Sequence, residues 1–148
     1  MSLRDSIRTE QLSGRRLDKA LRTFDKQARW ICFEDIKRVL NRYIGEPVVV
    51  WGHIGWLRED DSGTAFELNS WERQKNFASI FASEYSNKCT GQLHKCDFFV
   101  RYPGGQVQFH HGTPTYYVYG ILGEWSSDLV NQYGAPVPMP SIDAEFVK

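Results

Sequence analysis

The sequence contains no long apolar run. No stretch approaches the roughly 18 apolar residues that a membrane-spanning helix needs, and the segment Met1 to Gln11 has no apolar run between its charges, unlike a secretory signal. We therefore expect a protein without membrane association, located in the cytoplasm.

Cysteine is scarce and odd in number. The three residues are Cys32, Cys89 and Cys96. An odd count argues against a disulfide framework, and without an export signal the simplest expectation is three thiols in a reducing compartment.

No recognised metal or nucleophile motif is present. Cys89, His94 and Cys96 lie close together, with His110 and His111 further on, but zinc sites usually gather their ligands from paired short spacings. No glycine-framed nucleophile accompanies a cysteine or serine. The sequence therefore predicts no metal, no cofactor and no catalytic residue, and it favours a protein without catalytic activity.

Charge of one sign is not in excess. Eighteen Lys or Arg balance eighteen Asp or Glu, whereas a dedicated nucleic-acid binder usually has a basic surplus. The charges are uneven along the chain, because residues 1–46 hold eleven basic and seven acidic residues and the rest holds the reverse. This asymmetry indicates either an arm that meets an acidic partner or a solvated helix of mixed charge.

Aromatic residues, in contrast, are abundant. They make up 14% of a chain of 148 residues, which has the size of one domain. A small core cannot enclose so many rings, so we expect some ring faces to reach solvent and to act as contact surface. We expect a single domain, 1–148, with a basic helical segment at 1–46, a β-rich core at 47–125 and an extended C-terminal tail at 126–148.

Helical spacing dominates the first part. Apolar positions from Leu17 to Ile31 recur every three or four residues, which places them on one face of a helix. The same spacing from Phe33 to Tyr43 has a shifted phase, so the sequence predicts a break near Cys32 and a second helix. Gly45 and the following proline are expected to end it.

The composition then changes to that of strands. We expect β-strands over 48–57, 64–69, 97–102 and 116–122, the first two forming a hairpin around the polar turn 59–63. A short strand over 106–110 is an option. The segment Ser70 to Asn87 fits a helix slightly better than a strand. Three prolines after Gly134 predict an extended strap over the surface.

Two expected strands carry glycine in their middles, Gly52 and Gly120, and glycine inside a strand often marks the bulge or bend that lets a sheet coil into a barrel. With the runs Val48 to Ile54 and Tyr117 to Leu122, the sequence resembles the OB-fold nucleic-acid-binding superfamily, in particular its tRNA-anticodon-binding-like members. The resemblance covers roughly 47–125. Together with the helices expected before it, the resemblance implies an α+β protein in which N-terminal helices precede a mainly antiparallel, OB-like coiled β-sheet or small barrel.

The resemblance also implies a site. An exposed face of such a sheet would bind single-stranded nucleic acid by stacking bases on rings. Strand alternation turns one set of side chains outward, and α-helical arginines add phosphate contacts. The predicted nucleic-acid-binding residues are Trp51, His53, Arg101, Tyr117, Tyr119, Arg15 and Arg16. The competing interpretation is that these rings pack beneath the N-terminal helices.

The sequence therefore predicts a non-catalytic binding module with single-stranded nucleic acid as its partner. One alternative is a protein–protein adaptor, because aromatic residues and Arg also dominate protein interfaces. Another is a small-ligand binder or enzyme with a pocket around His53, His110 and His111. The sequence does not indicate whether the chain assembles with itself.

Overall fold

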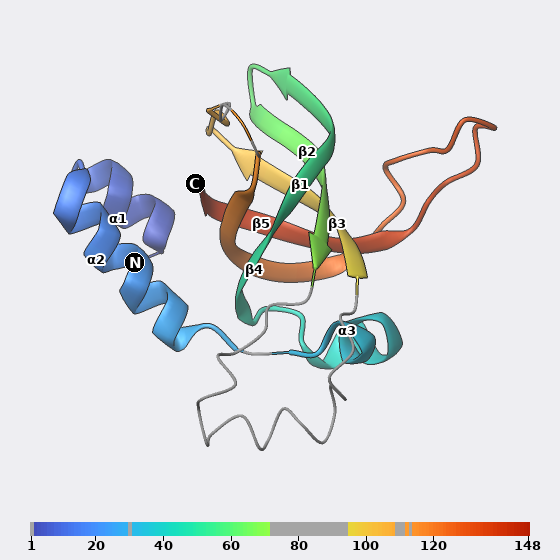
Figure 1. The fold of residues 1–148 in the computed structure, drawn as a ribbon, viewed down its shortest axis with the longest axis horizontal. Helices are drawn as coiled ribbons and strands as arrows, with labels where there is room; N and C mark the ends of the chain where they lie inside the picture. The colour runs from blue at the N-terminus through green and yellow to red at the C-terminus, as the bar shows by residue number, and fades with distance from the viewer. Residues whose placement is uncertain (1, 30, 72–94, 109–111, 113) are drawn as a thin grey trace.

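The chain folds into a closed five-stranded barrel preceded by short helices. The computed structural model describes residues 2–29, 31–71, 95–108, 112 and 114–148. The helical elements are α1 (Leu3–Thr9), α2 (Gly14–Gln27), α3 (Phe33–Val39) and the 3₁₀ turn η1 (Leu40–Arg42). The strands are β1 (Pro47–Asp60), β2 (Gly63–Trp71), β3 (Lys95–Pro103), β4 (Tyr116–Ser126) and β5 (Met139–Val147). Their order around the barrel is β1-β2-β3-β5-β4 (Figure 1).

The barrel confirms the predicted α+β class. Every neighbouring pair of strands is antiparallel except β3 and β5, which run parallel. The helices α1 and α2 lie together beside β4, and α3 lies at one end of the barrel (Figure 1). In the part of the chain that the structure describes, no helix has the length and apolarity to cross a membrane.

The two predicted helices are present with the predicted break. Helix α2 ends at Gln27, because Ala28 adopts an extended backbone, and α3 begins directly after Cys32. Gly45 follows η1 with φ +92°, a left-handed conformation that favours glycine. The additional helix α1 was not predicted. It is only seven residues long, and the Ser2 hydroxyl caps it by accepting a bond from the Asp5 N–H at 3.1 Å.

The predicted hairpin is formed by β1 and β2. Asp60 and Gly63 are paired at its end, and the Asp60 carboxylate accepts a bond from the Ser62 N–H at 2.8 Å. Hydrogen bonds from the Ser62 side chain and backbone lower the pKa of Asp60. A β-bulge between Ile54 and Trp56 bends β1, which lets one strand belong to two sides of the barrel.

The two strand glycines stand where backbones approach closely. A Cβ on Gly52 would lie 2.1 Å from the Asn69 carbonyl oxygen, and one on Gly120 would lie 2.6 Å from the Asp143 carbonyl oxygen. Gly52 pairs with Tyr116 of β4 and also with β2, so β1 changes neighbours at this residue. A register shift lies beside Gly120, as expected for a bend, whereas the bulge of β1 lies beyond Gly52, between Ile54 and Trp56.

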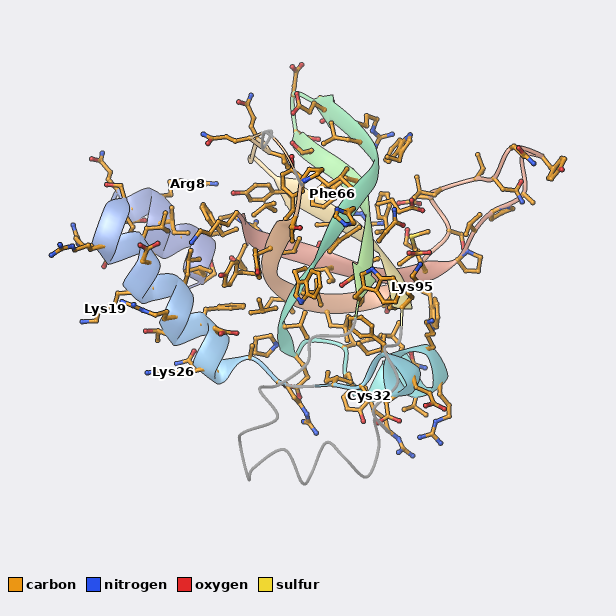
Figure 2. The ribbon with its side chains drawn as sticks, in the orientation of Figure 1. Arg8, Lys19, Lys26, Cys32, Phe66 and Lys95 are labelled. Atoms are coloured by element: carbon orange, nitrogen blue, oxygen red, sulfur yellow. The ribbon has the colours of Figure 1, made fainter. Side chains whose placement is uncertain are left out.

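The barrel interior is apolar and closely follows the predicted alternation. Inward side chains from all five strands are buried, and α3 closes one end, where Phe33 meets Phe98 edge to face at 5.5 Å. Phe66 and Phe98 have no exposed surface and are the largest of the fully buried side chains (Figure 2 labels Phe66). The other fully buried side chains include Ile36, Leu68, Val100, Val118, Leu122 and Ile142.

The prediction of a surface strap at the C-terminus is wrong. Residues 139–147 form β5, which joins β3 to β4 and closes the barrel. Its polar residues are satisfied by long-range contacts: the Ser141 hydroxyl donates to the Glu124 carbonyl at 2.6 Å, and Glu145 accepts a bond from the Arg4 N–H at 2.9 Å. The optional short strand is not formed at residues 106–108, which are irregular, and the segment 72–94 lies outside the described residues.

The cysteines differ from one another. Cys32 takes part in a disulfide, whereas Cys96 is a buried thiol on β3. The expectation of three thiols is therefore wrong for Cys32, and the cytoplasmic location stays a prediction.

Candidate binding face

The structure places four of the predicted site residues on the outward-facing positions of β1 and β4. Trp51 and Tyr117 are direct cross-strand partners on β1 and β4. His53 lies two residues further along β1, and Tyr119 lies two residues further along β4. Because every second side chain of a strand points to the same face, all four side chains point outward. We call the surface around Trp51, Tyr117 and Tyr119 the helix-side face.

Helix α2 covers part of this helix-side face. The Phe24 ring meets Tyr119 edge to face, with ring centroids 6.0 Å apart, and Val49, which also points outward, is buried. Tyr117 stays 44% exposed, and Trp51 is half-buried. Both sequence interpretations thus hold in part, because the helix covers some of the predicted rings and leaves others accessible.

The predicted basic residues do not join this surface. Arg101 lies on β3, where it pairs with Ala65 of β2, and its guanidinium forms an ion pair with Asp128 at 2.7 Å. Arg15 and Arg16 are exposed at the start of α2, and Arg16 lines a groove of about 580 Å³ between α1, α2 and the barrel.

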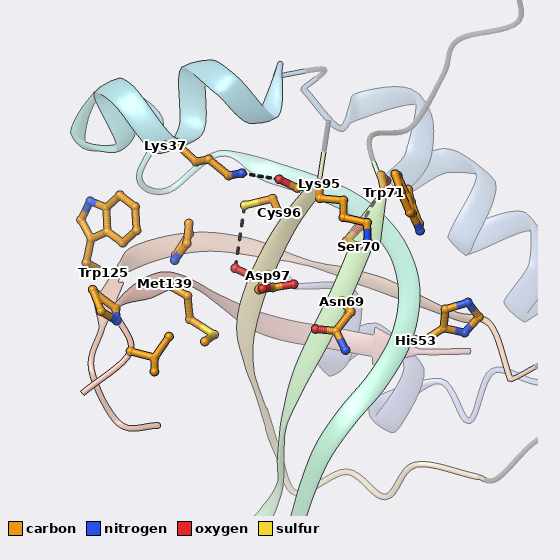
Figure 3. A pocket seen from close by; sticks show the side chains of 13 residues that line it. Lys37, His53, Asn69, Ser70, Trp71, Lys95, Cys96, Asp97, Trp125 and Met139 are labelled. Carbon is orange, nitrogen blue, oxygen red and sulfur yellow. Dashed lines mark hydrogen bonds between the residues drawn. The ribbon is translucent and has the colours of Figure 1, made fainter. Parts of the chain in front are cut away.

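A second cavity lies elsewhere, on the outside of β2 and β3. Its volume is about 650 Å³, within the usual range for ligand sites. Side chains from β2, β3, α3, β1 and the end of the β4–β5 connection surround it (Figure 3). They are Lys37, His53, Asn69, Ser70, Trp71, Lys95, Cys96, Asp97, Trp125, Val137, Pro138, Met139 and Pro140. We call this surface the pocket face.

Two tryptophans flank the pocket face. Trp71 is half-buried at the end of β2, and Trp125 is 45% exposed on β4. In the view of Figure 3, Asn69 and Asp97 lie between these two rings. The site therefore combines aromatic walls with a polar floor, and such an arrangement suits a flat ligand with hydrogen-bonding edges.

Cations gather at one end of the pocket face. The Lys95 ammonium lies 4.3 Å from the centroid of the Trp71 ring, a cation–π contact. Lys37 of α3 donates to the Lys95 carbonyl oxygen and so ties α3 to the first residue of β3 (Figure 3). Both ammonium groups retain further N–H donors, because each carries three. This end of the pocket is suited to an anionic group.

The polar floor is ordered by one amide. With the Asn69 amide oriented to satisfy its neighbours, its nitrogen donates to the Asp97 Oδ1 at 3.0 Å and to the Glu67 Oε1 at 3.3 Å. Burial and the nearby negative charge of Asp97 raise the pKa of Glu67. Asn69 thus fixes two carboxylates on neighbouring strands, of which Asp97 lines the pocket.

The connection between β4 and β5 forms a projecting arm, residues 127–138 (Figure 1). An isolated bridge pairs Val130 with Pro136, and the Asn131 side chain accepts bonds from the N–H groups of Tyr133 and Ala135. The base of the arm supplies one wall of the pocket. Near its tip, Val130 is 61% exposed and Tyr133 is 83% exposed.

The described residues bear on only part of the metal and histidine alternatives. The described residues contain no group of three His, Cys, Asp or Glu placed to hold a metal ion, and Cys89, His94, His110 and His111 lie outside them. His53 does line the pocket, where its Nδ1 lies 3.0 Å from the Pro114 carbonyl oxygen.

Sequence reasoning missed most residues of the pocket face. Asn69 and Trp71 alternate with the buried Leu68 and Ser70, and Lys95 and Asp97 alternate with Cys96 and Phe98. This alternation was a usable signal that they point outward. Trp125 had no such signal, because its place beside the pocket depends on how β5 and the arm fold back.

Neither protein-family models nor curated proteins provide a relative for this chain.

Proposed function

We propose that the protein is a non-catalytic binding module and that its ligand is single-stranded nucleic acid, held on the pocket face. The observation that carries the proposal is the cavity of about 650 Å³ between Trp71 and Trp125, with Lys37 and Lys95 at its edge. Bases stack on aromatic rings irrespective of sequence, and ammonium groups neutralise phosphates.

The position of the cavity in the barrel supports the proposal. The closed order β1-β2-β3-β5-β4 is compatible with an OB-like fold. OB-folds bind oligonucleotides and oligosaccharides on the face of their second and third strands, between the connections that join strands one to two and four to five. The pocket shares part of these surroundings, since β2, β3 and the β4–β5 arm line it, whereas the β1–β2 turn does not.

The experiment is a titration of a fluorescein-labelled, mixed-sequence, single-stranded oligonucleotide with the full chain, followed by anisotropy at two salt concentrations. We expect binding at low salt that weakens steeply as salt is added, because bound cations are released from the phosphates. Trp125→Ala should weaken binding by roughly 5- to 150-fold, which corresponds to about 1–3 kcal/mol for one stacked base.

Trp56→Ala is the matched control. Trp56 is 40% exposed on β1 and carries its own cation–π contact with Arg58 at 5.8 Å, but it does not line the pocket. We expect this variant to bind like the parent. Equal losses in both variants would reject the pocket face, and an absence of binding to any oligonucleotide at low salt would reject the proposed ligand.

A second candidate function is a protein–protein adaptor, and the β4–β5 arm favours it. Val130 is 61% exposed and Tyr133 is 83% exposed near the tip of the arm, and residues 129–138 carry no charged side chain. Exposed aromatic and aliphatic side chains on an uncharged projection are typical of protein interfaces. Tyr133→Ser separates the two functions, because it should leave oligonucleotide affinity unchanged.

A further inference from the structure

We propose that the pocket face selects guanine within a single-stranded ligand, with the Asp97 carboxylate accepting both N–H groups of the guanine Watson–Crick edge. This inference rests on the proposed function and adds a base preference to it. The features that carry it are the acceptor on the pocket floor, the flanking tryptophans and the neighbouring lysines.

The floor of the pocket offers a preorganised acceptor. Asn69 donates to the Oδ1 of Asp97 at 3.0 Å, which leaves that oxygen a second lone pair. Among the described residues, the Asp97 Oδ2 has no hydrogen-bond partner, so this oxygen can accept a bond from a ligand. Since Asn69 already holds the carboxylate in place, little rotational freedom is lost when a ligand binds it.

Guanine is the base that matches such an acceptor. Its Watson–Crick edge carries two adjacent donors, the N1–H and the N2 amino group. Adenine and cytosine present one amino group beside an acceptor nitrogen, and thymine presents one N–H between two carbonyl oxygens. A carboxylate accepts two parallel hydrogen bonds and donates none, so it pairs well with guanine and repels the acceptors of the other bases.

The same ligand uses the other features of the pocket. The guanine ring system can stack on Trp71 or Trp125 while its edge faces Asp97, which lies between them in Figure 3. The attached phosphates then meet Lys37 and Lys95 at the end of the pocket. A cationic ligand would satisfy Asp97 but would be repelled by these lysines, so a guanine nucleotide fits the whole charge pattern better.

The test uses labelled twelve-nucleotide oligothymidylates that differ at one central position, which is thymine, adenine, cytosine, guanine or hypoxanthine. We expect the guanine oligonucleotide to bind about fivefold or more tightly than the thymine one, the lower range for a bidentate contact. Hypoxanthine keeps the N1–H but lacks the N2 amino group, so it should lose most of this advantage.

Asp97→Asn should remove the guanine preference, because the amide replaces one acceptor oxygen by a donor group. Asp143→Asn is the control for the lost charge, since Asp143 is exposed on β5 and does not line the pocket. It should retain the preference. The inference is overturned if the parent binds all five oligonucleotides equally, if hypoxanthine binds as tightly as guanine, or if the preference survives in Asp97→Asn. The first of these results leaves the proposed function standing, whereas no binding of any oligonucleotide ends both.

Discussion

The two outer surfaces of the barrel have similar side chains but different surroundings. On the helix-side face, Tyr119 packs against Phe24 of α2. On the pocket face, Trp71 and Trp125 border an open cavity. Both surfaces arise from the same strand alternation, so alternation alone identifies outward residues but does not identify which of them a helix will cover.

The difference has a simple cause. The apolar stripe of α2 must be buried against the barrel, and the rings of β4 provide the apolar surface for it. The pocket face is polar at its centre, where Asn69 joins Glu67 to Asp97. An apolar helix docked there would bury these groups away from water at a cost.

The most disruptive test of this division is Gly52→Ala, because Gly52 joins the two surfaces. The added Cβ would lie 2.1 Å from the Asn69 carbonyl oxygen and 2.8 Å from the Ser70 Cα, which are backbone atoms. We expect the free energy of unfolding to fall by about 3 kcal/mol, measured by urea denaturation. In Gly55→Ala the Cβ meets only side-chain atoms of Glu67 and Asn69, which can rotate away, so its effect should be clearly smaller. Equal effects would show that the close backbone approach does not limit stability.

A smaller loss of stability is expected from Phe24→Ala, which uncovers the helix-side face alone. Removing the partly buried ring and its contact with Tyr119 should lower the free energy of unfolding by about 2 kcal/mol. Oligonucleotide affinity, measured by anisotropy, should not change, because no α2 residue lines the pocket. A marked loss or gain of affinity would indicate that the oligonucleotide binds the helix-side face and not the pocket face. Phe24→Leu, which keeps much of the buried area, should lose less stability.

The smallest expected effect is that of Glu67→Gln on the pocket face. The folded state raises the pKa of Glu67, chiefly by burial and then by the charge of Asp97, so ionisation of this carboxyl opposes folding. The protonated form of Glu67 therefore adds stability to the parent at low pH. This stability is lost as the pH rises through the folded pKa, which lies above the ordinary value of 4.5. At neutral pH the variant should be more stable by up to about 1 kcal/mol, the scale for partly exposed charges. Denaturation curves at neutral pH and near pH 3 measure this, and a gain that persists at the lower pH would contradict the explanation.

Local pattern was sufficient to predict much of the fold. The spacing from Leu17 to Ile31 and from Phe33 to Tyr43 predicted two helices, and β-branched runs and turn residues predicted the first four strands. These signals depend on residues close in sequence. They also predicted the closing of the sheet, through Gly52 and Gly120.

The fifth strand was missed for a physical reason. Pro136, Pro138 and Pro140 indicated a strap, and the buried Ser141 and Glu145 are not typical of a barrel strand. Their polar groups are satisfied by Glu124 and Arg4, which are distant in sequence. The parallel pairing of β3 with β5 is equally non-local.

The candidate site was harder to predict than the fold. A pocket requires that strands, a helix and a connection converge, and β5 and the arm had been assigned to a surface tail. Of the predicted site residues, His53 alone lines the pocket described above. The aromatic excess correctly indicated exposed rings, but it did not distinguish Trp71 and Trp125 from Trp51 and Tyr117.

The change of neighbours within β1 has a mechanical consequence. Up to Gly52 the strand is bonded to β4, and from Gly52 onward it is bonded to β2. Gly52 has no side chain, so its backbone lies directly against the backbone of Asn69. A shift of β1 away from Asn69 would therefore disturb the pairing of Gly52 with Tyr116. One strand therefore fixes the position of both outer surfaces. A ligand that displaces one surface must also strain the strand pairing that holds the other.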